Sequence, residues 1–285
     1  MSLVNASNSQ AHRDLSGADA EIVKQAIRRN EYSGHTAGLC PGLLQCNLVI
    51  LPEAQADDFQ SFCEANPIPC PLVARSNPGD VAIDRLGPEI DLRTELPLYR
   101  IYRNGVASGD CQDVKWLWRD DFVSFAIGCS FTFEKALENA GIEMRHVTQN
   151  VTVPMFKTSL PTVEVGPFGG PTVVSMRPIK SKDVAHVREI CAAYPLAHGE
   201  PIHVGDPERI GITDIKNPDW GLPVTIRDDE VPVLWGCGVT SQIAISHAPP
   251  DLCITHAPGA MLITTINELA NSEGKTAELP EEKLQ

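Results

Sequence analysis

The stretch Glu230-Val-Pro-Val-Leu-Trp-Gly-Cys-Gly-Val-Thr-Ser-Gln242 decides the fold prediction, because an apolar run stops there at a glycine-flanked cysteine. Residues 231 to 235 suit a buried strand, and the glycines on both sides of Cys237 permit close backbone approaches. The pattern predicts a strand, a tight turn and a helix start. In open α/β sheets ligands bind at the carboxyl ends of strands, and a helix start offers free N–H groups to an anion or a thiolate. Alternatively, Cys237 is a buried and inert small hydrophobe.

A second element of the same kind is Gly128-Cys129-Ser130, which follows an apolar run. The residues after it have apolar side chains at helical spacing and stop at Gly141, and Ser130 or Thr132 can cap that helix. Cys129 is therefore predicted to lie beside a helix amino terminus. Two cysteines in the same setting favour a functional site more strongly than one does.

The composition limits the kind of partner. The 285 residues include 37 acidic and 23 basic ones, and the formal charge of -14 argues against nucleic acid or an anionic membrane surface. A small anionic substrate would need a local cluster of arginines or main-chain donors. The amino terminus lacks the pattern of an export signal, and no stretch approaches about 18 uninterrupted apolar residues, so we expect a cytoplasmic protein. The nine cysteines are then expected to be thiols.

Strand and helix signals alternate along the chain and predict an α/β fold. We expect a helix capped by Ser16 and a strand at 47 to 51. We predict a larger three-layer α/β domain formed by residues 1–114 and 201–285, with a smaller two-layer α/β domain, residues 115–200, inserted in it. The smaller domain would combine two helices with short β-prone runs, at 130 to 140, 142 to 147, 151 to 156, 172 to 176 and 182 to 193.

Arginines are concentrated between residues 91 and 105, around a predicted strand at 98 to 103. The planar fork of an arginine such as Arg93 or Arg100 could bind a carboxylate. Ion pairing with the abundant Asp and Glu residues is an equally good alternative.

Histidines mark two further segments. His198, His203 and Asp206 lie within nine residues of one another. An extended segment would point the two histidines to opposite sides, which disfavours a metal site. His256 follows a short strand and precedes a Pro-Gly turn, a position that suits an acid or a base.

Eight short blocks between about residues 17 and 268 carry a resemblance to a known family, and they are more specific together than any one alone. They are Pro41-Gly-Leu-Leu-Gln-Cys-Asn-Leu48, Phe62-Cys63 through Cys70-Pro-Leu72, Arg93-Thr94 through Tyr102-Arg103, Ile127-Gly-Cys-Ser-Phe131, Val174-Ser-Met-Arg-Pro178, His198-Gly199 through Gly205-Asp-Pro207, Val231-Pro232 through Cys237-Gly-Val-Thr240, and Thr255-His-Ala-Pro-Gly259. On these blocks the chain resembles the hydro-lyase family that includes D-glutamate cyclase. The resemblance implies a three-layer domain with a smaller two-layer one.

The activity implied by the resemblance is loss of water from D-glutamate, or a related small acidic amino acid, to give 5-oxo-D-proline. No cofactor or metal is expected. Two other classes stay open: a non-catalytic binding module for a small acidic metabolite, and a metal-dependent lyase or hydrolase that uses His198, His203, Asp206 and His256. A homo-oligomer is also open.

A site can be assigned to this chemistry as a hypothesis. Arg177 clamps a carboxylate, main-chain N–H groups around Gly238 and Ser130 stabilise an oxyanion, and His256 donates or accepts a proton. Cys237 or Cys129 acts as a nucleophile through an acyl-thioester, or the two act as acid and base. The predicted substrate-binding residues are Arg177, Ser130, Gly238, Thr240, Arg100 and Arg93.

Overall fold

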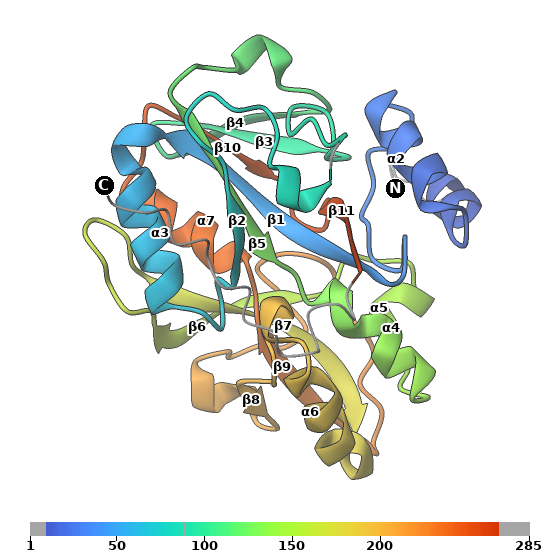
Figure 1. Ribbon diagram of the computed structural model, residues 1–285. Helices are drawn as coiled ribbons and strands as arrows, with labels where there is room; N and C mark the ends of the chain where they lie inside the picture. Colours follow the sequence, from blue (N-terminus) through green and yellow to red (C-terminus); the bar gives the residue numbers. More distant parts are fainter. Residues whose placement is uncertain (1–9, 88, 268–285) are drawn as a thin grey trace, which may run out of the picture.

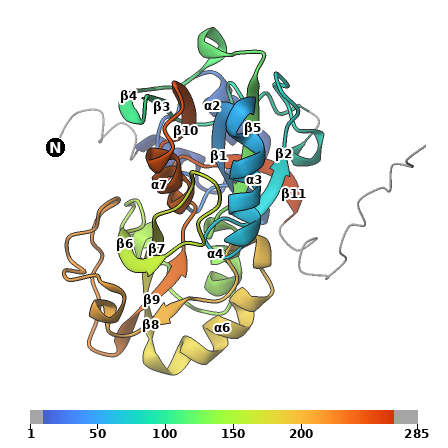
Figure 2. The same ribbon diagram turned by 90° about the vertical axis from the view of Figure 1, so that its left-hand side faces the viewer.

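Two antiparallel β-sheets organise the computed structural model, which describes residues 10–87 and 89–267 (Figures 1 and 2). The first sheet has seven strands, and Figure 1 shows it above the second, which has four. The strand order of the first sheet is β2 (Leu72–Arg75), β5 (Phe122–Gly128), β1 (Leu43–Pro52), β10 (Leu252–His256), β3 (Tyr99–Arg103), β4 (Val106–Cys111), with β11 (Leu262–Asn267) also paired to β1. The order of the second is β6 (Met155–Pro161), β7 (Pro171–Lys180), β9 (Glu230–Gly236), β8 (His203–Val204).

The strand, turn and helix predicted around Cys237 are present. β9 ends at Gly236, and α7 (Val239–His247) follows with Gly238 as its N-cap. The paired strands of both sheets are antiparallel throughout the described ranges. The rule that places ligands at the carboxyl ends of strands in open, mostly parallel sheets therefore does not explain this site.

The first sheet lies between a helical layer and a layer of loops. Alternate side chains of β1 face opposite sides, as the pleat of a strand requires. Val49 and Leu51 pack against α7 and against α3 (Ala56–Ala65). Leu48 and Ile50 face loops and short 3-10 turns, whose apolar side chains include Leu86, Leu92, Leu96 and Val114.

Two helices cover one face of the second sheet, α4 (Phe131–Asn139) and α6 (Val184–Ala192). Phe133 of α4 and Val187 of α6 pack with the fully buried Trp235 of β9. The opposite face is covered by loop residues that include Ile210 and Ile212. The α/β fold with two sheets is thus confirmed. The described residues contain no helix with the length and apolar character of a membrane span.

Two helices cross from one sheet to the other, each directly after a cysteine turn. β5 is a strand of the first sheet, but α4, which follows Cys129, packs on the second. β9 is a strand of the second sheet, and α7, which follows Cys237, packs on the first sheet through Ala244 and Ile245 while Thr240 in its first turn holds it to β7. The bounds proposed for the inserted domain, residues 115–200, do not coincide with the division between the two sheets. They leave out β8 and β9 of the second sheet and include β5 of the first. The division into domains stays a prediction.

Some local predictions were wrong. α2 (Ala20–Arg28) is capped by Asp19, whose side chain accepts a main-chain N–H at 2.9 Å, rather than by Ser16. Residues 142 to 147 form no strand, because the short helix α5 (Arg145–Thr148) begins there. Both errors concern the residue at which a helix begins.

Candidate active site

Cys129 and Cys237 occupy equivalent positions in two strand-turn-helix elements. Each main-chain N–H still donates to the neighbouring strand, at 3.0 Å in both cases, so each cysteine continues the ladder of its own sheet. α4 and α7 then begin, and the N–H groups of Phe131 and Val239 are directed at the thiols of Cys129 and Cys237 respectively. Both thiols therefore lie at the amino terminus of a helix, where main-chain donors stabilise negative charge.

Both thiols line one cavity of about 20 Å³, here named the inner cavity. A space of that size holds about one water molecule. Its walls come from both sheets and both crossing helices, and they comprise Asn47, Cys129, Ser130, Phe131, Val153, Met155, Ser175, His198, Cys237, Gly238, Val239, His256, Gly259 and Met261. The structure thus brings Ser130, Gly238 and His256 together with the two cysteines.

Asn47 of β1 holds the two cysteine turns close together. Its Nδ2 donates to the carbonyl oxygen of Gly128 at 2.9 Å. A Cβ atom on Gly238 would lie 2.2 Å from the same nitrogen, and one on Gly128 would lie 1.5 Å from the main-chain oxygen of Leu196. Glycine is required at both turns because no side chain fits against these neighbours.

Burial keeps both thiols protonated near neutral pH. It raises the pKa of Cys237 to about 11, although the N–H of Val239 and the charge of Arg177 act in the opposite direction. It raises the pKa of Cys129 to about 12 against the N–H of Phe131. Because a thiolate is the nucleophilic form, both groups are proton donors in the closed cavity rather than ready nucleophiles.

The two histidines of the inner cavity are both neutral. His256 lies at the end of β10, and its Nδ1 is 3.3 Å from both the main-chain nitrogen and oxygen of Leu48. Nδ1 of His198 lies 2.8 Å from the carbonyl oxygen of Ile68, and the main-chain oxygen of Gly128 also forms a hydrogen bond with this imidazole. Burial lowers the pKa of both imidazoles to about 4.

Arg177 lies behind the cavity wall and not in it. Its side chain is fully buried, with the guanidinium 5.3 Å from the ring centroid of Trp235. Nη1 donates to Ser175 Oγ at 3.0 Å and Nη2 donates to Ser130 Oγ at 2.8 Å. Arg177 thus does not line the inner cavity, and its direct clamp on a substrate carboxylate stays a prediction. Because both serine oxygens accept from Arg177, their hydroxyl hydrogens are free to donate into the inner cavity.

Glu134 balances the charge of Arg177. Nε of Arg177 donates to its Oε1 at 2.9 Å, and Nε2 of His146 lies 3.1 Å from the same oxygen. Burial alone would raise the pKa of Glu134, but His146 and Arg177 together lower it to about 2. The pair is ionised and hydrogen-bonded inside the protein, as a buried ion pair must be.

The remaining predicted substrate-binding residues lie outside the inner cavity. Arg93 pairs with Asp91, with Nη2 at 2.8 Å from Oδ2, and Arg100 pairs with Asp110, with Nε at 2.8 Å from Oδ1. Thr240 Oγ1 accepts the main-chain N–H of Val173 at 2.9 Å and so fixes α7 to β7. The ion-pairing alternative describes both arginines. None of the three residues lines the inner cavity, although the N–H of Thr240 donates to the main-chain oxygen of Cys237 at 3.0 Å.

Three polar residues of the cavity, Asn47, Ser175 and His198, were not predicted as members of this site. Asn47 and Ser175 are polar side chains inside otherwise apolar strands, and that interruption was a signal in the sequence. His198 was considered only as a metal ligand. It has a positive φ of 76°, an uncommon backbone conformation for a non-glycine residue, and such conformations concentrate at functional sites.

The proposed metal ligands do not converge. His198 and His256 reach the inner cavity, but Nε2 of His203 lies 2.7 Å from the main-chain oxygen of Asp206 on an exposed turn. In the described part of the chain, no three His, Cys, Asp or Glu side chains are grouped so that they could hold a metal ion.

Comparison with known proteins identifies the family. The sequence profile described as D-glutamate cyclase matches residues 123–265. A protein of Verminephrobacter eiseniae named "Putative hydro-lyase" is 51% identical over 264 residues, which cover 93% of this chain and 96% of that protein. This chain belongs to the D-glutamate cyclase family. The family match covers β5 through most of β11, and so contains both cysteine turns.

Other family members are equally similar. A protein of the same name from Jannaschia sp. is 51% identical over 257 residues, 90% of this chain and 97% of that protein. One from Geobacillus kaustophilus is 50% identical over 245 residues, 86% of this chain and 93% of that protein. These names support a hydro-lyase, a member of the lyases. A nitrogen repressor-like protein from Methanococcus jannaschii has a TM-score of 0.35 and 8% identity over 77% of this chain and 87% of that one, too distant a likeness to transfer any property.

Proposed function

We propose that this protein removes water from D-glutamate, or from a closely related acidic amino acid, to give the five-membered lactam 5-oxo-D-proline. The observation that carries the proposal is the inner cavity, which gathers two protonated thiols and two neutral imidazoles. Membership of the D-glutamate cyclase family supports the choice of D-glutamate as substrate. Proton donors and proton acceptors are the groups that this dehydration needs.

The reaction balances without a redox step. The ammonium nitrogen of glutamate loses two protons and forms a bond to the side-chain carboxyl carbon. One carboxylate oxygen leaves that carbon and takes up two protons, so it departs as water. The overall charge of the amino acid does not change, and the protein has only to move protons and to stabilise the tetrahedral oxyanion between the two halves of the reaction.

Each step has a candidate group in the inner cavity. A neutral imidazole, His198 or His256, accepts a proton from the ammonium, since a histidine with a pKa of about 4 is unprotonated near pH 7. The thiol of Cys237 or Cys129 donates to the departing oxygen. The hydroxyl of Ser130 and the main-chain N–H groups at the helix starts are the donors for the oxyanion.

The high pKa values of the thiols favour this acid role over the acyl-thioester route, which needs a thiolate. Cys237 is the better candidate acid, because it is only partly buried whereas Cys129 is buried. Arg177 acts on the substrate indirectly, because it holds the hydroxyl oxygens of Ser130 and Ser175 in place.

Incubation with D-glutamate, L-glutamate and 5-oxoproline, followed by mass spectrometry for loss or gain of water, tests the proposal. We expect conversion of the D enantiomer and its loss in Cys237→Ala. Cys191→Ala is the matched control, because it removes a buried thiol from the second sheet's core outside the inner cavity. No turnover of either enantiomer would reject the activity, and calorimetry on the same samples would show whether the protein only binds them.

A further inference from the structure

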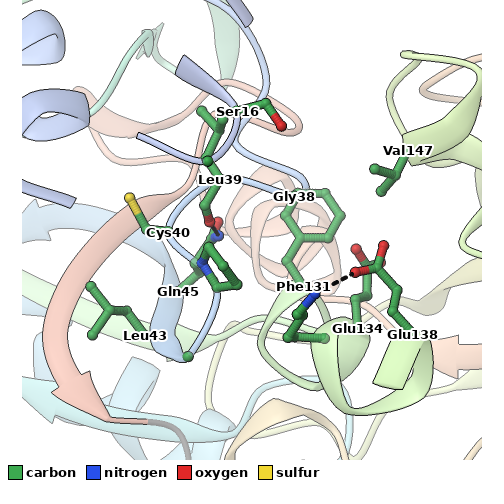
Figure 3. A pocket seen from close by; sticks show the side chains of 14 residues that line it. Ser16, Gly38, Leu39, Cys40, Leu43, Gln45, Phe131, Glu134, Glu138 and Val147 are labelled. Atoms are coloured by element: carbon green, nitrogen blue, oxygen red, sulfur yellow. Dashed lines mark hydrogen bonds and ion pairs between the residues drawn. The ribbon is translucent and has the colours of Figure 1, made fainter. Parts of the chain in front are cut away.

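A second cavity lies directly outside the inner one. It measures about 260 Å³ and is here named the outer cavity (Figure 3). Phe131, the first residue of α4, lines both cavities and so forms part of the wall between them. The outer cavity is lined by Ser16, Gly17, Gly38, Leu39, Cys40, Pro41, Gly42, Leu43, Gln45, Phe131, Glu134, Lys135, Glu138 and Val147. It has the room for a small amino acid that the inner cavity lacks.

One wall of the outer cavity presents carboxylates from a single helix face. Glu134 and Glu138 are one turn apart on α4, and Figure 3 shows both side chains projecting from that helix. Glu134 is 3% exposed, and within the described ranges no group donates to its Oε2. A buried carboxylate oxygen without a donor costs free energy, which a ligand with N–H groups would recover.

Glu138 forms a weaker ion pair with Lys135 than Glu134 forms with Arg177. Its Oε2 lies 3.6 Å from Nζ of Lys135, and both side chains are partly exposed. Such a surface pair is weak. A ligand that carries both an ammonium and a carboxylate can replace the pair with two ligand contacts, one to Glu138 and one to Lys135.

The facing wall is main chain. Gly38, Cys40 and Gly42 all have positive φ angles, of 75°, 49° and 91°. Pro41 has no N–H, and the N–H groups of Leu39 and Leu43 donate to the main-chain oxygens of Thr36 and Cys40. The N–H groups of Gly38, Cys40 and Gly42 are therefore the ones that this loop can offer to a carboxylate. The two walls together are complementary to a zwitterion, with acceptors on α4 and donors on Lys135 and the loop.

We infer that the outer cavity is the first binding site for a zwitterionic amino acid, with its ammonium on Glu134 and Glu138, and that the Phe131 ring separates it from the inner cavity. This rests on the proposed function, since it assigns the entry route to the same reaction. The inner cavity has no room for the substrate until the ring moves. Phe131 packs parallel to the His146 ring at 6.0 Å, so its motion also changes the contacts of the group beside Glu134.

Alkylation of Cys237 by iodoacetamide, quantified by peptide mass spectrometry on the full chain, measures access without needing turnover. We expect Phe131→Ala to raise the alkylation rate at least fivefold, and D-glutamate to slow alkylation of the unsubstituted protein. In Glu138→Gln we expect the D-glutamate concentration that halves the alkylation rate of Cys237 to rise about threefold or more. The KM should rise by the same factor, and kcat should not change. Glu189→Gln is the matched control, because Glu189 forms an exposed i,i+3 pair with His186 at the same 3.6 Å.

The outcomes separate this inference from the proposed function. If D-glutamate protects Cys237 from alkylation, the protection weakens in Glu138→Gln and no turnover is seen, the outer cavity is supported and the activity is rejected. If the protein turns over D-glutamate but Glu138→Gln changes neither the KM nor the protection, the outer cavity is rejected and the activity stands. The same conclusion follows if the protein turns over D-glutamate but Phe131→Ala does not change the alkylation rate. If D-glutamate is neither turned over nor protects Cys237 from alkylation, both the outer cavity and the activity are rejected.

Discussion

Replacement of Arg177 by Met tests the assignment of this residue as a support for the cavity wall. The substitution keeps most of the apolar stem and removes the guanidinium, so Glu134, which is 3% exposed, keeps His146 but loses its arginine partner. The pKa of Glu134 falls from an ordinary 4.5 to about 2 in the folded protein. That shift corresponds to about 3 kcal/mol of stabilisation. His146 and Arg177 produce this shift together, so Arg177 supplies only part of it. Loss of one partner of a buried ion pair typically costs about 3–5 kcal/mol, because the other charge stays buried without its counter-ion.

Urea denaturation followed by tryptophan fluorescence would measure this cost. At pH 7 we expect Arg177→Met to lower the free energy of unfolding by about 3–5 kcal/mol. The carboxylate is stabilised in the folded state, so its contribution is present above pH 4.5 and is lost as the pH falls towards 2. The difference between the two proteins should shrink over that interval.

The double variant Glu134→Gln/Arg177→Met separates charge from packing. It leaves no unpaired ion, so it should recover part of the stability that Arg177→Met loses. A loss below about 1 kcal/mol in the single variant, or costs that simply add in the double variant, would refute the account of a buried ion pair.

Three other predictions follow from single contacts. Gly128→Ala should fold poorly or not at all, because its Cβ would lie 1.5 Å from the main-chain oxygen of Leu196; a normal melting temperature would contradict this. As the pH falls from about 6.5 to 4, the unfolded His256 takes up a proton and the folded one, with a pKa of about 4, does not, so the free energy of unfolding decreases. His256→Asn should make this decrease smaller, and unfolding curves at pH 7.5 and 4.5 measure the change. Arg100→Met should leave the KM for D-glutamate within twofold, since Arg100 pairs with Asp110 away from the inner cavity; a tenfold rise would return it to the site.

The cysteine turns could be predicted because their signal is local. An apolar run, a glycine, a cysteine and a helix start are adjacent in the sequence, and β9 with α7 and β5 with α4 form as that pattern predicts. The eight blocks also identified the family before any contact was known. Sheet membership could not be predicted in the same way, since β1 pairs with β10 about two hundred residues later and each cysteine turn leads to a helix on the other sheet.

Arg177 shows why the site was only partly predictable. A charged residue in an apolar run, Val174-Ser-Met-Arg-Pro178, indicates a special role but not its direction. Its role depends on Glu134, which lies forty-three positions earlier and on a helix of a different strand-turn-helix element. The turn that contains Ser130 predicts its place beside Cys129, whereas the polar interruption at Ser175 gives no partner, and only the contact of Arg177 with both hydroxyls joins the two serines.

The crossing of α4 and α7 also determines how this protein can be divided. A fragment restricted to the strands from β6 to β9 would lack α4, whose Phe133 completes the core under Trp235. A fragment restricted to the first sheet would lack α7, whose Ala244 and Ile245 complete the core beside α3. Neither half should therefore fold by itself, and the whole chain should unfold in one transition. The inner cavity then disappears in the same step as both cores, so loss of the proposed activity on heating should coincide with loss of structure.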